Sequence, residues 1–112
     1  MTIYVANAFS LTMLTPPATV RVTEVSAEDV KNILKDGFTS AVGHEATSQI
    51  ISVQTGIQVP TNRISIKLAP GDVLIVFQLL ARLPEGKILS QDEMKQVAAK
   101  WFIVTINGGD EQ

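Results

Sequence analysis

The sequence of 112 residues contains no cysteine and one histidine, and only 18% of its residues are charged. Without cysteine the chain has no disulfide framework, no thiolate zinc site and no cysteine nucleophile, which agrees with a cytoplasmic location. Hydrophobic residues make up 46%, so the surface is expected to carry fewer charges than that of a typical soluble monomer. This balance favours burial of part of the surface against a second chain.

Long apolar runs and an excess of positive charge are also missing. The most apolar stretch, residues 73–81, falls short of the roughly 18 residues that span a bilayer, and no targeting signal is evident at the start. The formal net charge of -2 and the pI near 5.2 argue against binding to long nucleic acid, which needs several phosphates neutralised. We therefore expect a soluble cytoplasmic protein, with a small anionic ligand still possible.

Hydrophobic periodicity predicts five strands and three helices. Strands are expected at residues 3–6, 19–25, 62–68, 73–80 and 101–106, and helices at 26–37, 43–54 and from 90 onward. The turn at residues 70–72 would join the third and fourth strands as an antiparallel hairpin. The prediction is a single α+β domain over residues 1–112, a five-stranded mixed sheet flanked by about three helices, with residues 107–112 as a frayed tail.

The single histidine, His44, follows Gly43 where the second helix is expected to begin. An imidazole titrates near neutral pH, and a helix N-terminus attracts phosphate or carboxylate groups. Helical spacing predicts one apolar stripe of Ala46, Ile50 and Val53, with His44, Thr47, Ser48 and Ile51 on the opposite, outer side. The alternative is a surface histidine that only fills the start of the helix, and the single residue does not decide between them.

Polar residues at strand ends form a second group of candidates. Asn7 and Ser10 follow the first strand, where such side chains usually cap turns but can also contact ligands. Gln78 interrupts a strand expected to be buried on both faces, so its amide either ties down backbone or marks a polar pocket. Arg82 and Glu85 lie beyond that strand and could serve phosphate chemistry or form an ordinary surface salt bridge.

Several familiar site motifs are absent. His44-Glu45 does not begin a zincin motif, because the position of the second histidine is Ser48. No carboxylate cluster resembles a magnesium or calcium site, and there is no G-x-S-x-G elbow for a serine nucleophile. What remains is one histidine, two arginines and one glutamate, a set suited to metal-independent phosphodiester chemistry.

Four blocks of the sequence together resemble the viral anti-CRISPR ring nuclease family of archaeal viruses, which has phage and bacterial relatives. The blocks are Tyr4-Val5-Ala6-Asn7-Ala8-Phe9-Ser10, Gly43-His44-Glu45-Ala46-Thr47, Asn62-Arg63 and Arg82-Leu83-Pro84-Glu85-Gly86-Lys87. They occur in the expected order and extend across nearly the whole chain. The resemblance is therefore far more specific than any single motif.

The resemblance implies a homodimer that encloses cyclic tetra-adenylate, the second messenger of type III CRISPR defence. Such an enzyme cuts the ring to linear di-adenylate with a 2′,3′-cyclic phosphate, using the ligand's own 2′-hydroxyl and no metal or cofactor. Destruction of the messenger would silence the nucleases it activates, in the host cytoplasm if the protein is viral.

The resemblance also implies residue roles at the matching positions. His44 would be the general acid, one from each subunit, while Arg82 would stabilise the phosphate and Glu85 would orient the site or assist proton transfer. The remaining positions are expected ligand contacts: Asn7, Ser10, Gly43, Arg63 and Gln78.

Two other functions remain open on the sequence. A non-catalytic sponge would bind the cyclic nucleotide at the same site and release it uncut. A small dimeric viral or phage interaction protein would explain the high hydrophobic fraction without any nucleotide. The origin of the protein, its preferred ring size and its turnover rate are not determined by the sequence.

Overall fold

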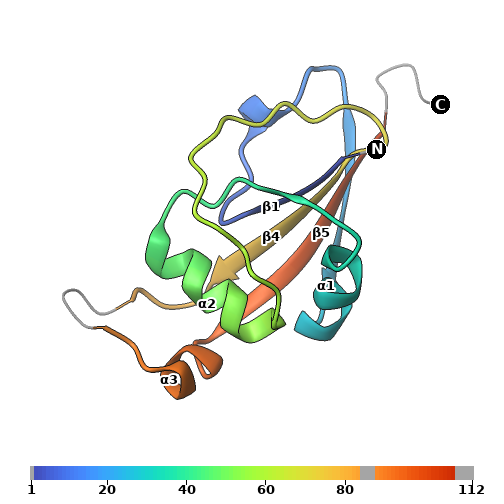
Figure 1. The fold of residues 1–112 in the computed structure, drawn as a ribbon. Coiled ribbons are helices and arrows are strands. Elements are labelled where there is room, and N and C mark those ends of the chain that lie inside the picture. Colours follow the sequence, from blue (N-terminus) through green and yellow to red (C-terminus); the bar gives the residue numbers. More distant parts are fainter. Residues whose placement is uncertain (1, 84–87, 108–112) are drawn as a thin grey trace.

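The computed structural model describes residues 2–83 and 88–107 (Figure 1). Five strands and three α-helices form one α+β domain, as predicted. In chain order the elements are β1 (Ile3–Ala6), the 3-10 turn η1 (Leu11–Met13), β2 (Thr19–Val25), α1 (Ala27–Leu34), β3 (Thr39–Ser40), α2 (Glu45–Thr55), β4 (Val73–Leu79), α3 (Gln91–Lys95) and β5 (Ala99–Asn107). Asn107 belongs to β5 rather than to a tail, and residues 108–112 lie outside the described part.

The strands lie in the order β2-β5-β4-β1-β3. β1 pairs in parallel with both β3 and β4, whereas β5 pairs antiparallel with β4 and β2. The sheet is thus mixed, in agreement with the prediction. β4 occupies its centre, and Leu74 to Phe77 are buried on both faces of the sheet, as a continuous apolar run requires.

The prediction of a strand at residues 62–68 is wrong, and so is the hairpin with β4. This segment forms no ladder; it crosses one face of the sheet as an extended loop, with Ile66 and Leu68 buried and Ile64 exposed. Leu68 donates its backbone N–H to the carbonyl of Met13, in the other loop on that face, at 2.7 Å. An extended segment shows alternating burial whenever it lies on an apolar surface, whether or not it is hydrogen-bonded to another strand. The alternating sequence of residues 62–68 was therefore wrongly interpreted as a strand.

The fifth strand is instead β3, two residues that the sequence pattern did not separate from the following loop. Tyr4 pairs with Thr39 and Val5 with Ser40, and the N–H of Ala41 donates to the carbonyl of Val5 at 2.7 Å. Two residues are too short to produce a periodic signal. The parallel pairing with β1 creates this strand.

The helices cover one face of the sheet, where α1 and α2 lie side by side (Figure 1). Their core packs against the odd-numbered side chains of β4 and β5, including Phe77 and Trp101, whose ring centroids are 4.7 Å apart. The fully buried helix residues are Val30, Leu34, Ile50 and Ile51. The even-numbered side chains face a second core, which the two long loops cover from the other side.

The helix ends follow their sequence signals. Ser26 with Asp29 and Ser90 with Glu93 form reciprocal capping boxes at the starts of α1 and α3, because a serine followed three residues later by a carboxylate satisfies two free N–H groups at once. The end of α2 is Gly56, with φ of +74°, a left-handed conformation that glycine adopts without steric cost. This stop fixes where the chain turns back along α2.

We expect Gly56→Ala to lower the free energy of unfolding by about 1 to 2 kcal/mol, because the left-handed conformation strains any residue with a Cβ. A Cβ at this position would meet nothing within 4 Å, so the loss reports backbone conformation alone. Chemical denaturation of the variant and the wild type measures it. An unchanged unfolding midpoint would contradict the assigned helix end.

Candidate functional site

The candidate site lies where the parallel strands end. The pairings of Val5 with Ser40 and of Ala6 with Val76 run the carboxyl ends of β1, β3 and β4 toward the same edge of the sheet. The residues that follow are Asn7 after β1, the segment 41–44 after β3 and residues 80–82 after β4. Loops at the carboxyl ends of parallel strands are a common place for ligands.

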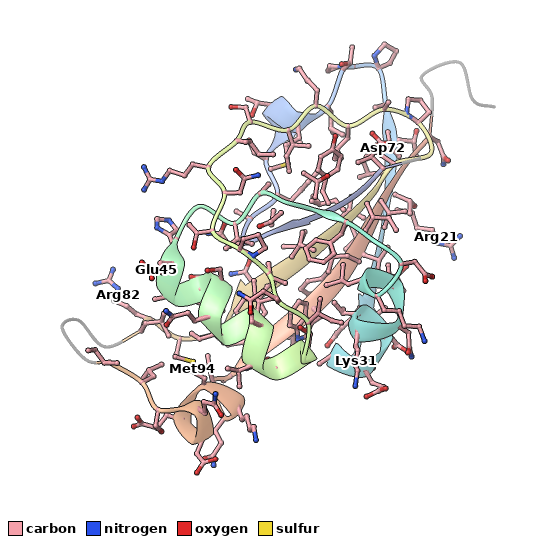
Figure 2. The ribbon with its side chains drawn as sticks, viewed as in Figure 1. Arg21, Lys31, Glu45, Asp72, Arg82 and Met94 are labelled. Atoms are coloured by element: carbon pink, nitrogen blue, oxygen red, sulfur yellow. The ribbon has the colours of Figure 1, made fainter. Side chains whose placement is uncertain are left out.

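An open hollow of about 1000 Å³ occupies this edge. Its lining combines His44 with the chain that leaves β4, residues 79–83, which includes Arg82. Figure 2 shows Arg82 and Glu45, the neighbour of His44, on the same side of the molecule. The structure thus brings together two of the three predicted catalytic residues, from positions 38 apart in the sequence.

His44 is the N-cap residue of α2, one position before the first helical turn. Its backbone is extended, with φ of -128° and ψ of 129°, and its carbonyl accepts the N–H of Ser48 at 3.0 Å. The imidazole is exposed and caps no backbone group of the helix. It therefore stands beside the positive end of the helix dipole and the unpaired N–H groups of the first turn, free to meet a ligand.

The predicted division of α2 into an inner and an outer side is wrong in part. Thr47, Ser48 and Ile51, expected on the outer side, are buried, whereas Ala46 is exposed. Burial of Ser48 is possible because its hydroxyl is bonded: Ser48 Oγ donates to the carbonyl of Glu45 at 2.9 Å. The prediction that His44 is exposed is confirmed, although the helix begins at Glu45 and not at Gly43.

Arg63 lies against the residue that precedes the histidine. Its Nε donates to the carbonyl of Gly43 at 3.0 Å, and a Cβ on Gly43 would lie 3.3 Å from Arg63 Cγ. The terminal guanidinium nitrogens have no hydrogen-bond partner among residues 2–83 and 88–107. Arg63 is therefore anchored through one nitrogen while two remain for an anion.

Arg82 is exposed and forms no ion pair with any residue that the structure describes. The one ion pair found in the described part joins Lys100 to Glu24 at 3.9 Å, on the β5–β2 side of the sheet. The salt bridge that the sequence left open for Arg82 involves the loop of residues 84–87, so it stays a prediction. Glu85, its predicted neighbour in the site, lies outside the described residues, and its role stays a prediction.

None of the five predicted ligand contacts lines the hollow itself: Gly43 directly precedes His44 and is contacted by Arg63, and the other three are placed as follows. Asn7 is half-buried just beyond β1, on the edge that carries the site. Ser10 is the N-cap of η1, where its Oγ accepts the N–H of Thr12 at 3.3 Å, so the turn-capping alternative holds for it. Gln78 was expected to be buried but is exposed, and its Nε2 donates to the carbonyl of Leu79 at 3.1 Å.

The sequence pattern assigned no role to Ser40 or to Asn62, although Asn62 belongs to the Asn62-Arg63 block of the family resemblance. Both side chains bond to backbone next to the site. Asn62 Nδ2 donates to the carbonyl of Ser40 at 2.7 Å, and Ser40 Oγ donates to the carbonyl of Pro60 at 2.6 Å. An asparagine after Pro60-Thr61 is a typical loop signal. It was overlooked because residues 62–68 were assigned to a strand.

Two further properties concern the described residues alone. Among residues 2–83 and 88–107, no three His, Asp or Glu side chains gather closely enough to hold a metal ion. Nor does any helix there have the length and apolar character needed to cross a membrane.

Comparison with known proteins identifies the family. The model of the STIV B116-like family matches residues 3–101, which span all the elements that build the site. The chain belongs to the STIV B116-like family. The solved structure of B116 from Sulfolobus turreted icosahedral virus superposes with a TM-score of 0.82 at 29% identity, covering 94% of this chain and 99% of B116. The mixed-sheet fold is thus the B116 fold.

Curated relatives of this B116-like chain come from viruses and from a bacterium. Protein 26 of Sulfolobus islandicus filamentous virus is 40% identical over 76 residues, 66% of this chain and 64% of that protein. ORF117 of Acidianus two-tailed virus is 33% identical over 78% of this chain and 77% of its own length. YddF of Bacillus subtilis is 27% identical over 83% of this chain and 89% of YddF. The family therefore has archaeal viral and bacterial members.

Gly43→Ala should lower the free energy of unfolding by less than about 1 kcal/mol, because the new Cβ meets only a flexible, exposed side chain. It should weaken the bond from Arg63 Nε to the Gly43 carbonyl, since Arg63 must move by a few tenths of an ångström. Denaturation and the NMR signal of the Arg63 Nε–H group test the two effects. An unperturbed Arg63 signal would contradict the contact.

Proposed function

We propose that this protein is a metal-independent ring nuclease that binds cyclic tetra-adenylate between two copies of the chain and cleaves it to linear di-adenylate with a 2′,3′-cyclic phosphate. The observation that carries the proposal is the meeting of His44 and Arg82 around one open hollow at the start of α2. A proton donor, a phosphate-binding cation and a helix N-terminus are the parts that such a reaction requires. The identity of the ligand, cyclic tetra-adenylate, is inferred from the resemblance of the four sequence blocks to ring nucleases.

In this mechanism the ligand provides its own nucleophile. The 2′-hydroxyl of one nucleotide attacks the adjacent phosphorus, the bond from phosphorus to the 5′-oxygen breaks, and the 2′-proton leaves to Glu85 or to water. The His44 imidazolium donates its proton to the departing 5′-oxygen. Arg82 stabilises the charge that develops on the phosphate, and the protein's main contribution is to align the attacking oxygen with the leaving one.

The charges around the hollow fit a small anion rather than a long polyanion. Arg82, His44 and the terminal nitrogens of Arg63 lie on the same edge of the sheet, whereas the whole chain has a net charge of -2. Glu45 in the first turn of α2 adds a negative charge beside the histidine. A few placed cations in an otherwise acidic protein select against duplex nucleic acid.

A second copy of the chain completes the proposed site. The hollow is open to solvent and is lined by one His44. A four-nucleotide ring has four phosphates, and two of them on opposite sides of the ring would be cut. A twofold axis through the ring would place one His44 at each of these two phosphates and would cover the exposed side chains at this edge. The ring would then be enclosed and cut twice, to two di-adenylates in the host cytoplasm.

A sponge is the second candidate, because the same cations and helix N-terminus would bind the ring without cleaving it. Either function should raise the thermal stability of the protein, since a ligand at 100 times its dissociation constant adds about 2.7 kcal/mol. A protein whose role is only to contact another protein would give no such shift. Recovery of the ring, intact or cut, separates the first two functions.

The wild type incubated with cyclic tetra-adenylate in EDTA should yield di-adenylate, detected by mass. His44→Ala should lower the cleavage rate by about 100-fold or more while retaining binding, because it removes the general acid. Gln49→Ala, at an exposed position one turn further along α2, is the matched control and should cleave normally. Cleavage by His44→Ala at the wild-type rate would refute its role, and an intact ring from the wild type would favour the sponge.

Arg82→Lys should lower kcat by about tenfold or more, because a lysine keeps the charge but loses the planar guanidinium fork. Arg21→Lys is the control: this exposed arginine lies on β2, away from Arg82 (Figure 2). Steady-state cleavage rates of both variants measure the difference. Equal rates for Arg82→Lys and the wild type would remove the arginine from the proposed mechanism.

A further inference from the structure

The backbone that leads into His44 is held from both sides. On one side, β3 pairs with β1, and the N–H of Ala41 donates to the carbonyl of Val5 at 2.7 Å. On the other side runs the loop of residues 60–63, which the sequence pattern had partly assigned to a strand. We call the bonds between residues 40–43 and residues 60–63 the loop clamp.

The loop clamp consists of four direct hydrogen bonds. Asn62 contributes two of them: its Nδ2 donates to the carbonyl of Ser40 at 2.7 Å and its backbone N–H to the carbonyl of Val42 at 2.8 Å. The other two run from Ser40 Oγ to the carbonyl of Pro60 at 2.6 Å and from Arg63 Nε to that of Gly43 at 3.0 Å. Three of the four residues before His44, namely Ser40, Val42 and Gly43, thus have their carbonyls bonded to this loop.

The loop of residues 60–63 is itself anchored to α2 and to the core. Val59 is 1% exposed, and its N–H donates to Ser52 Oγ at 2.9 Å. The hydroxyls of Thr61 and Ser48 lie 2.7 Å apart. The loop therefore connects the body of α2 to the residues just before its first turn.

The imidazole of His44 depends on this backbone for its position. Within the described residues the His44 side chain has no hydrogen-bond partner, in contrast to a histidine oriented by a carboxylate or a carbonyl. What remains to orient the ring is the extended backbone of His44, which directly follows the residues that the loop clamp and β1 hold. Displacement of a catalytic group by about 1 Å can cost roughly 100-fold in rate.

We propose that Asn62 is a positioning residue that holds the 40–43 backbone, and through it the His44 imidazole, in place at the start of α2. Its side-chain amide supplies a donor that no backbone group of the loop replaces. The positioning of the ring is a property of the free protein. Its consequence for catalysis rests on the proposed nuclease function.

The first test uses the fact that the chain contains one histidine, so that a carbon-13 histidine label gives a single imidazole Cε1–H signal. In ligand-free Asn62→Ala we expect this signal to shift and broaden, because the backbone before His44 gains freedom. Asn32→Ala is the matched control: Asn32 is an exposed asparagine on α1 whose loss should leave the signal unchanged. Circular dichroism verifies that both variants are folded.

The second test measures cleavage of cyclic tetra-adenylate. Asn62→Ala should lower kcat by about 10- to 100-fold with little change in KM, because the misplaced group acts in the transition state. Asn32→Ala should match the wild type. If the wild type fails to cleave the ring, the nuclease function is refuted, while the NMR comparison still decides whether Asn62 positions His44.

Folded Asn62→Ala with a wild-type imidazole signal would overturn the proposal, as would an unchanged kcat. If Asn62→Ala does not fold, Asn62→Asp takes its place, since it keeps the shape of the side chain and removes only the Nδ2 donor to the Ser40 carbonyl, with Asn32→Asp as its control. A His44 signal that broadens in Asn62→Asp but not in Asn32→Asp would support the proposal, and an unbroadened signal in both would refute it.

Discussion

The parallel pairing of β1 with both β3 and β4 is the constraint on which the rest of this structure depends. β1 has only four residues, yet it joins β3 on one side to β4, the buried centre of the sheet, on the other. Parallel strands must be connected by chain that crosses over the sheet, and α2 lies in the crossover from β3 to β4, the two strands that flank β1. The start of α2 and the exit from β4 consequently come to one edge.

This arrangement separates stability from chemistry. The helix-covered core, built around Phe77 and Trp101, lies beneath α1 and α2, while His44 and Arg82 remain exposed at the ends of their elements. Neither of these two side chains has a polar partner in the described part of the chain. Among the described residues, the position of His44 therefore follows from the backbone that carries it, and the loop clamp holds the residues just before it.

The similarity to B116 shows that this fold, with its parallel pairing of β1, is kept at limited sequence identity. At 29% identity to B116 the present chain keeps the whole architecture. In a fold whose site is built from strand ends and one helix start, the core residues can change while the geometry of the edge persists.

The sequence could indicate the site residues more readily than their surroundings. His44 and Arg82 were singled out as candidates because a titratable ring at a helix start and an arginine beyond an apolar strand suit phosphate chemistry, whereas their roles came only from the family resemblance and stay predictions. Gln78 was wrongly expected to be buried. It lies near the end of β4, and an apolar strand can extend beyond the helices and loops that cover its two faces. Asn62 was missed because its partners, the carbonyls of Ser40 and Val42, are some 20 residues away and leave no pattern in the sequence.

Local signals in the sequence by themselves determined the capping boxes at Ser26 and Ser90, the end of α2 at Gly56 and the burial of β4, since each depends on neighbouring residues or on a run of one polarity. Tertiary structure alone decided that residues 62–68 form a loop over the sheet and that Thr39–Ser40 form a strand. A segment with alternating polarity can be buried with or without a ladder, and a two-residue strand exists only through its partner.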